Sequence, residues 1–123
     1  MENLVKKIVY INPRYLHVHD KQQFSTTTLV QLSAKIATIK AMTPIVIDGD
    51  CLGVVAGTEL FLASKMLKLP KVPVVIYQNL TCGEFDFLLG QIVDFIKAPQ
   101  KFRLNVIQNA KTVTPENIIK REQ

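Results

Sequence analysis

The stretch that decides the fold is LGVVAGTELFLASKMLKLPKVPVVIY, which runs from Leu52 to Tyr77. Its apolar ends predict two short strands, and the segment between them predicts a helix that begins just after Gly57. The first N–H groups of a helix have no partners within it, and such an end is a ready site for an anion. We therefore expect a ligand to bind at the turn formed by Gly57, Thr58 and Glu59.

Three elements are predicted upstream of this turn. The segment Val5–Ile11 is rich in β-branched and aromatic residues, which favour a strand. Hydroxyl side chains at 25–27 can cap a helix that must stop near Thr43, because the residue before a proline is driven out of the helical region. The apolar run Ile45–Ile47 and the strand after it are joined by Asp48-Gly49-Asp50, which is typical of a hairpin turn.

A long apolar helix is predicted downstream of the turn. Thr81 and Glu84 have the spacing of a capping box, so a helix should begin there and end near Pro99. The residues expected on its core face are Phe85, Leu88, Leu89, Ile92 and Ile96, widened by Phe87, Val93 and Phe95. A helix that is apolar over so much of its circumference is either deeply buried or part of a subunit interface, so we expect a homo-oligomer.

Length and composition indicate one globular domain. The chain has 123 residues, of which 48% are hydrophobic and 20% charged, so it can bury a core and is too apolar for a disordered chain. We expect a single domain over 1–123, with a core at about 5–97 and an extension at 98–123. No apolar run is long enough to cross a membrane, and no secretory signal is evident. The two cysteines lack metal-binding spacing and indicate free thiols, so a cytoplasmic protein is expected.

Basic charge is concentrated in the C-terminal extension. Residues 1–96 carry nine basic and eight acidic side chains, a balance of +1, whereas residues 97–123 carry six and two, a balance of +4. Within the extension, alternation at 101–106 predicts a strand. Such a segment can contact nucleic acid or an acidic partner, and the alternative is a solvated tail. The candidate nucleic-acid contacts are Lys97, Lys101, Arg103 and Lys111.

Two polar clusters are candidates for metal binding. The H-x-H segment at 17–19, followed by Asp20, has side chains that can bind a transition metal. These are the only histidines in the chain, so surface histidines are the favoured interpretation and no metal site is predicted. Asp48 and Asp50 could join Glu59 around Mg²⁺, but the Asp-Gly pair is far more often a turn, and the structural interpretation is favoured.

The order and spacing of three segments resemble a known family. They are LVQLSAKIATIKAMTPIVID at 29–48, the hairpin leading into G-x-x-x-x-x-A at 57–63, and KMLKLPKVPVVIY at 65–77. The region that contains them covers about three-fifths of the chain and resembles the N-terminal domain of ParB partition proteins, in the ParB/sulfiredoxin superfamily. The resemblance implies an α+β fold, with a small mixed sheet flanked by helices. It also implies that the glycine turn cradles nucleotide phosphates or, as in sulfiredoxins, carries a catalytic cysteine.

The chain departs from the family's phosphate-binding motif at this turn. Gly57 and Ala63 match the motif, whereas Glu59, Leu60 and Leu62 stand where the family has arginines. Neither a carboxylate nor a leucine can make the bidentate phosphate contact of an arginine. The resemblance therefore implies a degenerate nucleotide motif. We expect no tightly bound cofactor, with a nucleotide or Mg²⁺ as the alternative.

Three functions are consistent with these observations. The first is a ParB-like binding module that contacts nucleic acid or a protein in DNA partition, plasmid or phage biology, with little or no catalysis. The second is a metal-dependent nuclease or nucleotide hydrolase of the same superfamily, with Glu59, Asp48 and Asp50 as catalytic candidates. The third is a homo-oligomeric scaffold without a ligand at the turn. The first is favoured, because each carboxylate has a structural explanation.

Overall fold

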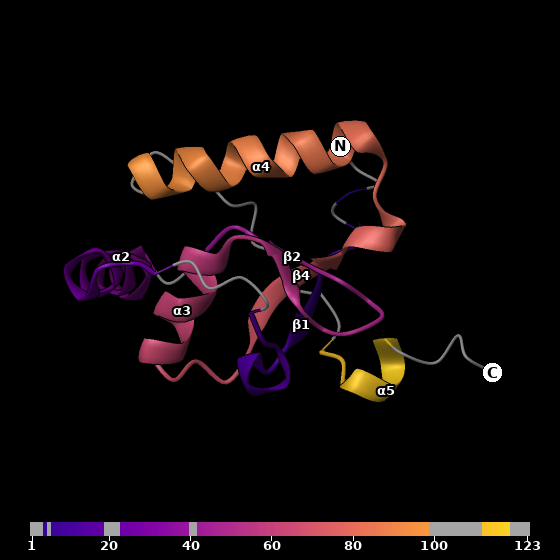
Figure 1. Ribbon diagram of the computed structural model, residues 1–123, viewed down its shortest axis with the longest axis horizontal. Helices are drawn as coiled ribbons and strands as arrows, with labels where there is room; N and C mark the ends of the chain where they lie inside the picture. Colours follow the sequence, from indigo (N-terminus) through magenta and orange to yellow (C-terminus); the bar gives the residue numbers. More distant parts are fainter. Residues whose placement is uncertain (1–3, 5, 19–22, 40–41, 99–111, 119–123) are drawn as a thin grey trace.

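Four short strands form one mixed sheet in the computed structural model, which describes residues 4, 6–18, 23–39, 42–98 and 112–118 (Figure 1). The strands are β1 (Val9–Ile11), β2 (Ile45–Ile47), β3 (Val54–Ala56) and β4 (Val72–Ile76). The helices are η1 (Pro13–Tyr15), α2 (Thr26–Ile39), α3 (Thr58–Met66), η2 (Tyr77–Asn79), α4 (Cys82–Lys97) and α5 (Pro115–Ile118). The fold is α+β, with helices flanking a small mixed sheet, as the sequence predicts.

The two central strands are the most apolar ones. The sheet order is β1-β4-β2-β3, and β4 pairs in parallel with β2 and antiparallel with β1. All three residues of β2 and the first four of β4 are buried, which is typical of strands covered on both faces. At the edge, β3 buries Val54 and Ala56 but leaves Val55 exposed. The centre of the sheet is therefore the centre of the core.

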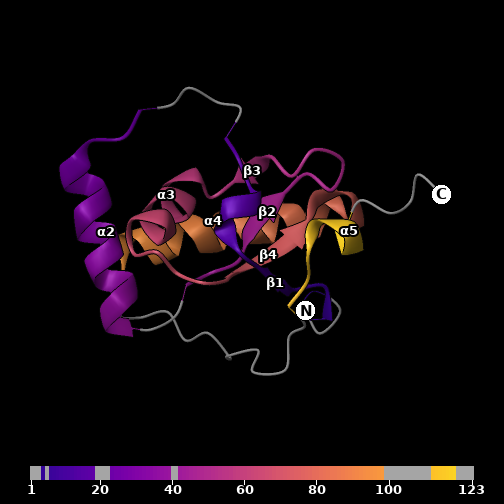
Figure 2. The ribbon, with the colours of Figure 1, turned by 90° about the horizontal axis from the view of Figure 1, so that it is seen from below.

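Helices cover the sheet on both sides. Figure 1 shows α4 running along one side of the sheet, and Figure 2, seen from below, shows it behind the strands. Helix α3 contacts β2 and β3 on one side and α2 on the other, so it lies between α2 and the sheet. The largest fully buried side chains from the helices are Phe61 and Leu60 of α3 and Phe95 and Leu88 of α4.

The position of α3 explains a difference from its predicted apolar face. The helical spacing predicts Ser64 on the solvent side and Met66 beside the core residues. In the structure Ser64 is fully buried, with its hydroxyl donating to the carbonyl oxygen of Phe61 at 2.6 Å, whereas Met66 is exposed. A helix between two packing partners is buried over most of its circumference, so a small polar residue there must bond to its own backbone.

The first strand is shorter than predicted. The predicted strand over Val5–Ile11 is wrong in its first half, since Leu4 and Lys6 are helical and β1 begins at Val9. The N–H of Lys7 donates to the carbonyl of Leu4 at 3.0 Å, and Leu4 is buried in the core. Tertiary packing of Leu4 therefore overrides the strand propensity of its neighbours.

Helix α4 begins at the predicted capping box but presents a different face to the core. Thr81 Oγ1 accepts from the N–H of Glu84 at 3.1 Å, and Glu84 Oε1 accepts from the N–H of Thr81 at 2.9 Å. The buried residues of the helix are Glu84, Leu88, Ile92 and Phe95. Leu89, predicted in the core face, is exposed, as are Phe87 and Val93. The core face is thus rotated by part of a turn toward the Glu84 side, and an apolar stripe stays on the surface.

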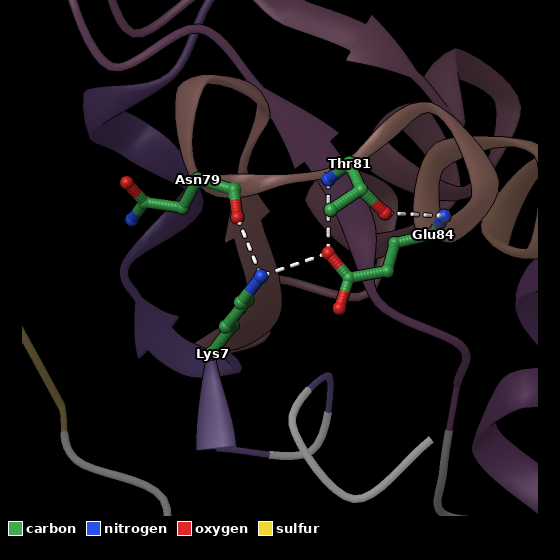
Figure 3. A network of polar contacts seen from close by, with 4 residues as sticks. All are labelled: Lys7, Asn79, Thr81 and Glu84. Atoms are coloured by element: carbon green, nitrogen blue, oxygen red, sulfur yellow. Dashed lines mark hydrogen bonds and ion pairs between the residues drawn. The ribbon is translucent and has the colours of Figure 1, made fainter.

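A charged clamp joins the start of α4 to the N-terminal segment (Figure 3). The ammonium of Lys7 lies 2.8 Å from Glu84 Oε1 and donates to the carbonyl of Asn79 at 2.6 Å. The hydrogen bond from Lys7, and after it the bond from the Thr81 N–H, holds the pKa of Glu84 below its ordinary value of 4.5. The clamp favours the ionised carboxylate in the folded state.

The clamp predicts a stability difference that depends on pH. Because the folded-state pKa of Glu84 is lowered, its contribution is complete above the ordinary pKa and is lost as the pH falls through the folded-state value. We expect Glu84→Gln to lower the melting temperature at about pH 7 and to differ little from the parent at about pH 2. Thermal melts across this range measure the difference. Lys7→Met should reduce the same pH dependence, and a melting difference that is constant with pH would contradict the clamp.

The last described segment returns to the first strand. Thr112 bridges Tyr10 in parallel, and the N–H of Val113 donates to the carbonyl of Tyr10 at 2.7 Å. Helix α5 follows, with the amide oxygen of Asn117 accepting from the N–H of Thr114. The predicted strand at 101–106 lies outside the described residues. Within the part of the chain that the structure describes, no helix has the length and apolar character needed to span a membrane.

Candidate functional site

The glycine turn occupies the junction between β3 and α3, as predicted. Gly57 has φ 93° and ψ 28°, a left-handed conformation that side chains disfavour. A Cβ at this position would lie 2.7 Å from Cγ2 of Ile45, the first residue of β2. Two independent constraints, backbone conformation and space, therefore require glycine here. The turn is pressed against the central part of the sheet.

The N-terminus of α3 is open, as expected for an anion site. The first helical hydrogen bond runs from the N–H of Phe61 to the carbonyl of Gly57 at 2.9 Å. No described side chain caps this end, which leaves the earlier N–H groups without helical partners. Thr58 and Glu59 are both partly exposed. The carboxylate of Glu59 lies in the first turn, where it suits the helix dipole and opposes an incoming anion.

The structure also shows a buried hydroxyl, that of Thr43, which the sequence analysis did not propose as a site residue. Thr43 is fully buried, and its Oγ1 has no hydrogen-bond partner among the described residues. It precedes Pro44 and lies two residues before Ile45, the side chain that packs against Gly57. Buried hydroxyls are nearly always bonded, so this oxygen has capacity for one more polar contact. The sequence signal is weak, because Thr-Pro reads as an ordinary helix-to-strand connection.

The two aspartates are separated from this turn. Asp48 follows β2 and precedes β3, whereas Gly57 follows β3, so they lie at opposite ends of the antiparallel hairpin. Asp48 Oδ1 accepts from the N–H of Asp50 at 2.7 Å and from the amide nitrogen of Gln78 at 2.9 Å. The carboxylates thus fasten the hairpin turn to η2. The structure does not bring Asp48 and Asp50 together with Glu59.

The other metal candidates gain no support from the described residues. His17 is exposed, and its backbone bridges Gly53 beside β3, while 19–20 lie outside the described part of the chain. No group of three histidine, cysteine or carboxylate side chains among the described residues is placed to hold a metal ion. Cys51 and Cys82 are thiols and do not form a disulfide, as the sequence indicates, and both side chains are exposed.

Of the four residues predicted to contact nucleic acid, one lies within the part of the chain that the structure describes. Lys97 is exposed in the last turn of α4. The other three, Lys101, Arg103 and Lys111, lie outside the described residues. Six further basic side chains are exposed elsewhere on the molecule, and four of them, at 14, 65, 68 and 71, are considered below although sequence reasoning did not select them. They are separated by up to 57 positions in the chain (71 − 14), and only the fold shows whether they share a surface.

Comparison with known proteins supports the fold. No family model matches the sequence, and no curated protein matches it. The structure is similar to that of the C-terminally truncated chromosome-partitioning protein ParB from Caulobacter crescentus, complexed with CTP-γ-S, with a TM-score of 0.52 and 21% sequence identity. The match covers 80% of this chain and 56% of that chain. The chain thus has a ParB-like fold and spans little more than half of the protein it matches.

Proposed function

We propose that this chain is a ParB-like binding module that contacts nucleic acid in a DNA partition, plasmid or phage context. The observation that carries the proposal is the ParB-like arrangement of the mixed sheet, the glycine turn and the following helix. Exposed basic side chains that lack a described acidic partner support nucleic acid as the binding partner. We propose that the module has little or no catalytic activity.

We propose that the glycine turn of this module binds nucleotides more weakly than the arginine-containing motif of the family does. The neighbour's ligand, CTP-γ-S, is a triphosphate analogue, and the open end of α3 supplies backbone N–H groups that such a ligand could meet. No arginine is present at 59, 60 or 62, and Glu59 adds a negative charge. We infer that a triphosphate binds at most weakly here.

No contact among the described residues favours the alternative function, a metal-dependent nuclease or nucleotide hydrolase. It requires carboxylates gathered around Mg²⁺ beside the turn. Asp48 and Asp50 lie at the other end of the hairpin and bond to their own turn and to Gln78. The homo-oligomer expected from the sequence remains a prediction, and the exposed side chains of Leu89 and Val93 on α4 are the surface that suits it.

Binding to duplex DNA tests the proposed function. We expect a fluorescent duplex to bind at about 50 mM salt and the affinity to fall steeply toward about 200 mM, because phosphate contacts release counterions. Fluorescence anisotropy measures the affinity. A bound ligand at about 100 times its Kd stabilises the protein by about 2.7 kcal/mol, so a thermal melt with DNA should shift upward and one with CTP-γ-S should not. Absence of binding at low salt, or affinity independent of salt, would contradict the proposal.

A further inference from the structure

Four exposed basic side chains are carried by segments that the fold places at one end of the sheet, namely η1, the end of α3 and the α3–β4 loop. They are Arg14, Lys65, Lys68 and Lys71, and together we call them the β1–α3 basic surface. We propose that the β1–α3 basic surface binds the phosphate backbone of duplex nucleic acid. This inference rests on the proposed function and assigns it to a surface other than the C-terminal extension.

The sheet register brings the four residues together. Ile11 pairs with Val72 in the antiparallel β1–β4 ladder, so the chain just after β1 and the chain just before β4 leave the sheet at the same end. Arg14 lies on the first of these segments and Lys71 on the second. Helix η1 also contacts α3, whose C-terminal turn and following loop carry Lys65 and Lys68. Figure 1 shows η1 and the α3–β4 loop along the lower edge of the molecule.

No acidic side chain among the described residues pairs with the charges of this surface. Neither of the segments that carry them, 6–18 and 60–83, contains an aspartate or glutamate. The acidic residues nearest in the sequence to these four are Asp20, which follows Arg14 and lies outside the described residues, and Glu59, at the far end of α3 from Lys65. An uncompensated positive surface attracts polyanions.

Aromatic rings hold three of the four cations in place. The Lys71 ammonium lies 4.8 Å from the centre of the Tyr10 ring, and the Arg14 guanidinium lies 4.9 Å from the centre of the Tyr15 ring. The Lys65 ammonium lies 5.4 Å from the centre of the Phe61 ring, which is buried. These contacts orient the cations and leave their charge intact. The covered ring faces are not open to stacked bases, so the surface suits phosphates rather than unpaired bases.

The chemistry of the surface favours nucleic acid over an acidic protein. Protein interfaces are built around large apolar anchors, and lysine is depleted in them. Met66 is the one large exposed apolar side chain that the described part of α3 and the loop after it carry. The other exposed apolar side chains include Leu89 and Val93, which lie on α4. A lysine-rich surface with few anchors fits a phosphate backbone, which is read by charge.

The four cations set the expected salt dependence. Each phosphate contact contributes about 0.9 to the slope of log affinity against log salt, so four contacts give a slope of roughly −3.6. The affinity for a random-sequence duplex should then fall roughly 150-fold between about 50 and 200 mM salt. Sequence should matter little, because contacts to phosphate carry no sequence information directly.

Two variants with equal charge loss test the assignment. One replaces Arg14, Lys65, Lys68 and Lys71 by glutamine, and the other replaces Lys97, Lys101, Arg103 and Lys111 by glutamine. Fluorescence anisotropy of a duplex of about 20 base pairs is measured against salt for both and for the parent. We expect the first variant to lose at least about 30-fold in affinity at low salt and most of the slope, and the second to lose less than about 5-fold. Thermal melts establish that both variants are folded.

The other possible results of these binding measurements separate the surface assignment from the proposed function. If the second variant loses binding and the first keeps it, the surface assignment is wrong while the proposed function stands. Equal losses would show a general charge effect and overturn the assignment. No binding by the parent at low salt overturns both proposals. Polyglutamate that competes as strongly as DNA of equal charge overturns nucleic acid as the partner. If the first variant does not fold, the Lys68→Gln and Lys71→Gln double variant replaces it, with about half the loss of slope expected.

Discussion

Replacing Gly57 by alanine lowers the free energy of unfolding by about 2–5 kcal/mol. Two costs add. The left-handed backbone at φ 93° is worth about 1–2 kcal/mol for a residue with a side chain. A methyl group 2.7 Å from Ile45 Cγ2 and 3.2 Å from Ile45 Cβ forces the buried Ile45 side chain or the turn to shift, which costs about 1–3 kcal/mol more. Urea unfolding monitored by circular dichroism measures the change.

The matched control for this substitution is Gly90→Ala. Gly90 lies in the middle of α4, and a Cβ there would meet nothing within 4 Å. Alanine is the better helix former, so this variant should gain about 0.5–1 kcal/mol. The same chemical change thus has opposite signs at the two glycines. A Gly57→Ala variant as stable as the parent would show that the turn does not have the left-handed conformation described here.

Replacing Phe95 by alanine lowers the free energy of unfolding by about 3–5 kcal/mol. Phe95 is among the largest fully buried side chains and lies on the core face of α4 with Leu88 and Ile92. Removing the ring loses its transfer free energy and leaves a cavity between α4 and the rest of the core. Urea unfolding of the parent and the variant measures the loss.

Phe87→Ala is the control for this prediction, because it removes the same ring from the same helix. Phe87 is 39% exposed, so its loss should change stability by no more than about 0.5 kcal/mol. The pair tests the observed core face of α4, because the sequence assigns both rings to the widened apolar face and the structure buries only Phe95. If Phe87→Ala and Phe95→Ala cost the same, the rotation of α4 described above is wrong.

Local signals predict the framework of this fold well. The capping box at Thr81 and Glu84 marks the start of α4 because both partners are close in the sequence. Gly57 likewise marks the β3–α3 turn, since a glycine between a predicted strand and a predicted helix is a strong local signal for a turn. The order of strands and helices that these signals delimit agrees with the ParB-like fold of the structure.

Features that depend on packing are not predicted by local pattern. Helix α4 is apolar on several sides, so hydrophobic periodicity cannot decide between Leu89 and Phe95 as the core residue. Ser64 is buried because α2 covers α3, which the sequence of α3 does not indicate. The clamp between Lys7 and Glu84 joins residues 77 positions apart. Each of these is a tertiary contact that overrides a local preference.

The residues of the candidate site also divide into those that local sequence predicts and those that only the tertiary fold places. Asp48, Asp50 and Glu59 are close in the sequence, and closeness suggests a shared site, but a hairpin places its turn and its ends apart. Arg14 and Lys71 are far apart in the sequence, and the β1–β4 register places them at the same end of the sheet. The sequence-based search for positive charge selects the dense C-terminal extension, whereas the β1–α3 basic surface that we propose consists of charges that are sparse in the sequence.

The place of β4 in the sheet has a consequence for the order of folding during synthesis. β4 is the last of the four strands to be made, yet both β1 and β2 pair with it. Only the β2–β3 hairpin can close before residues 72–76 leave the ribosome, and β1 must wait as an unpaired apolar segment while about 60 further residues are added. Closing such long loops makes folding slower than in a helical chain of similar length. The nascent chain therefore presents an open strand edge that a chaperone, or another nascent copy, can reach before the sheet is complete.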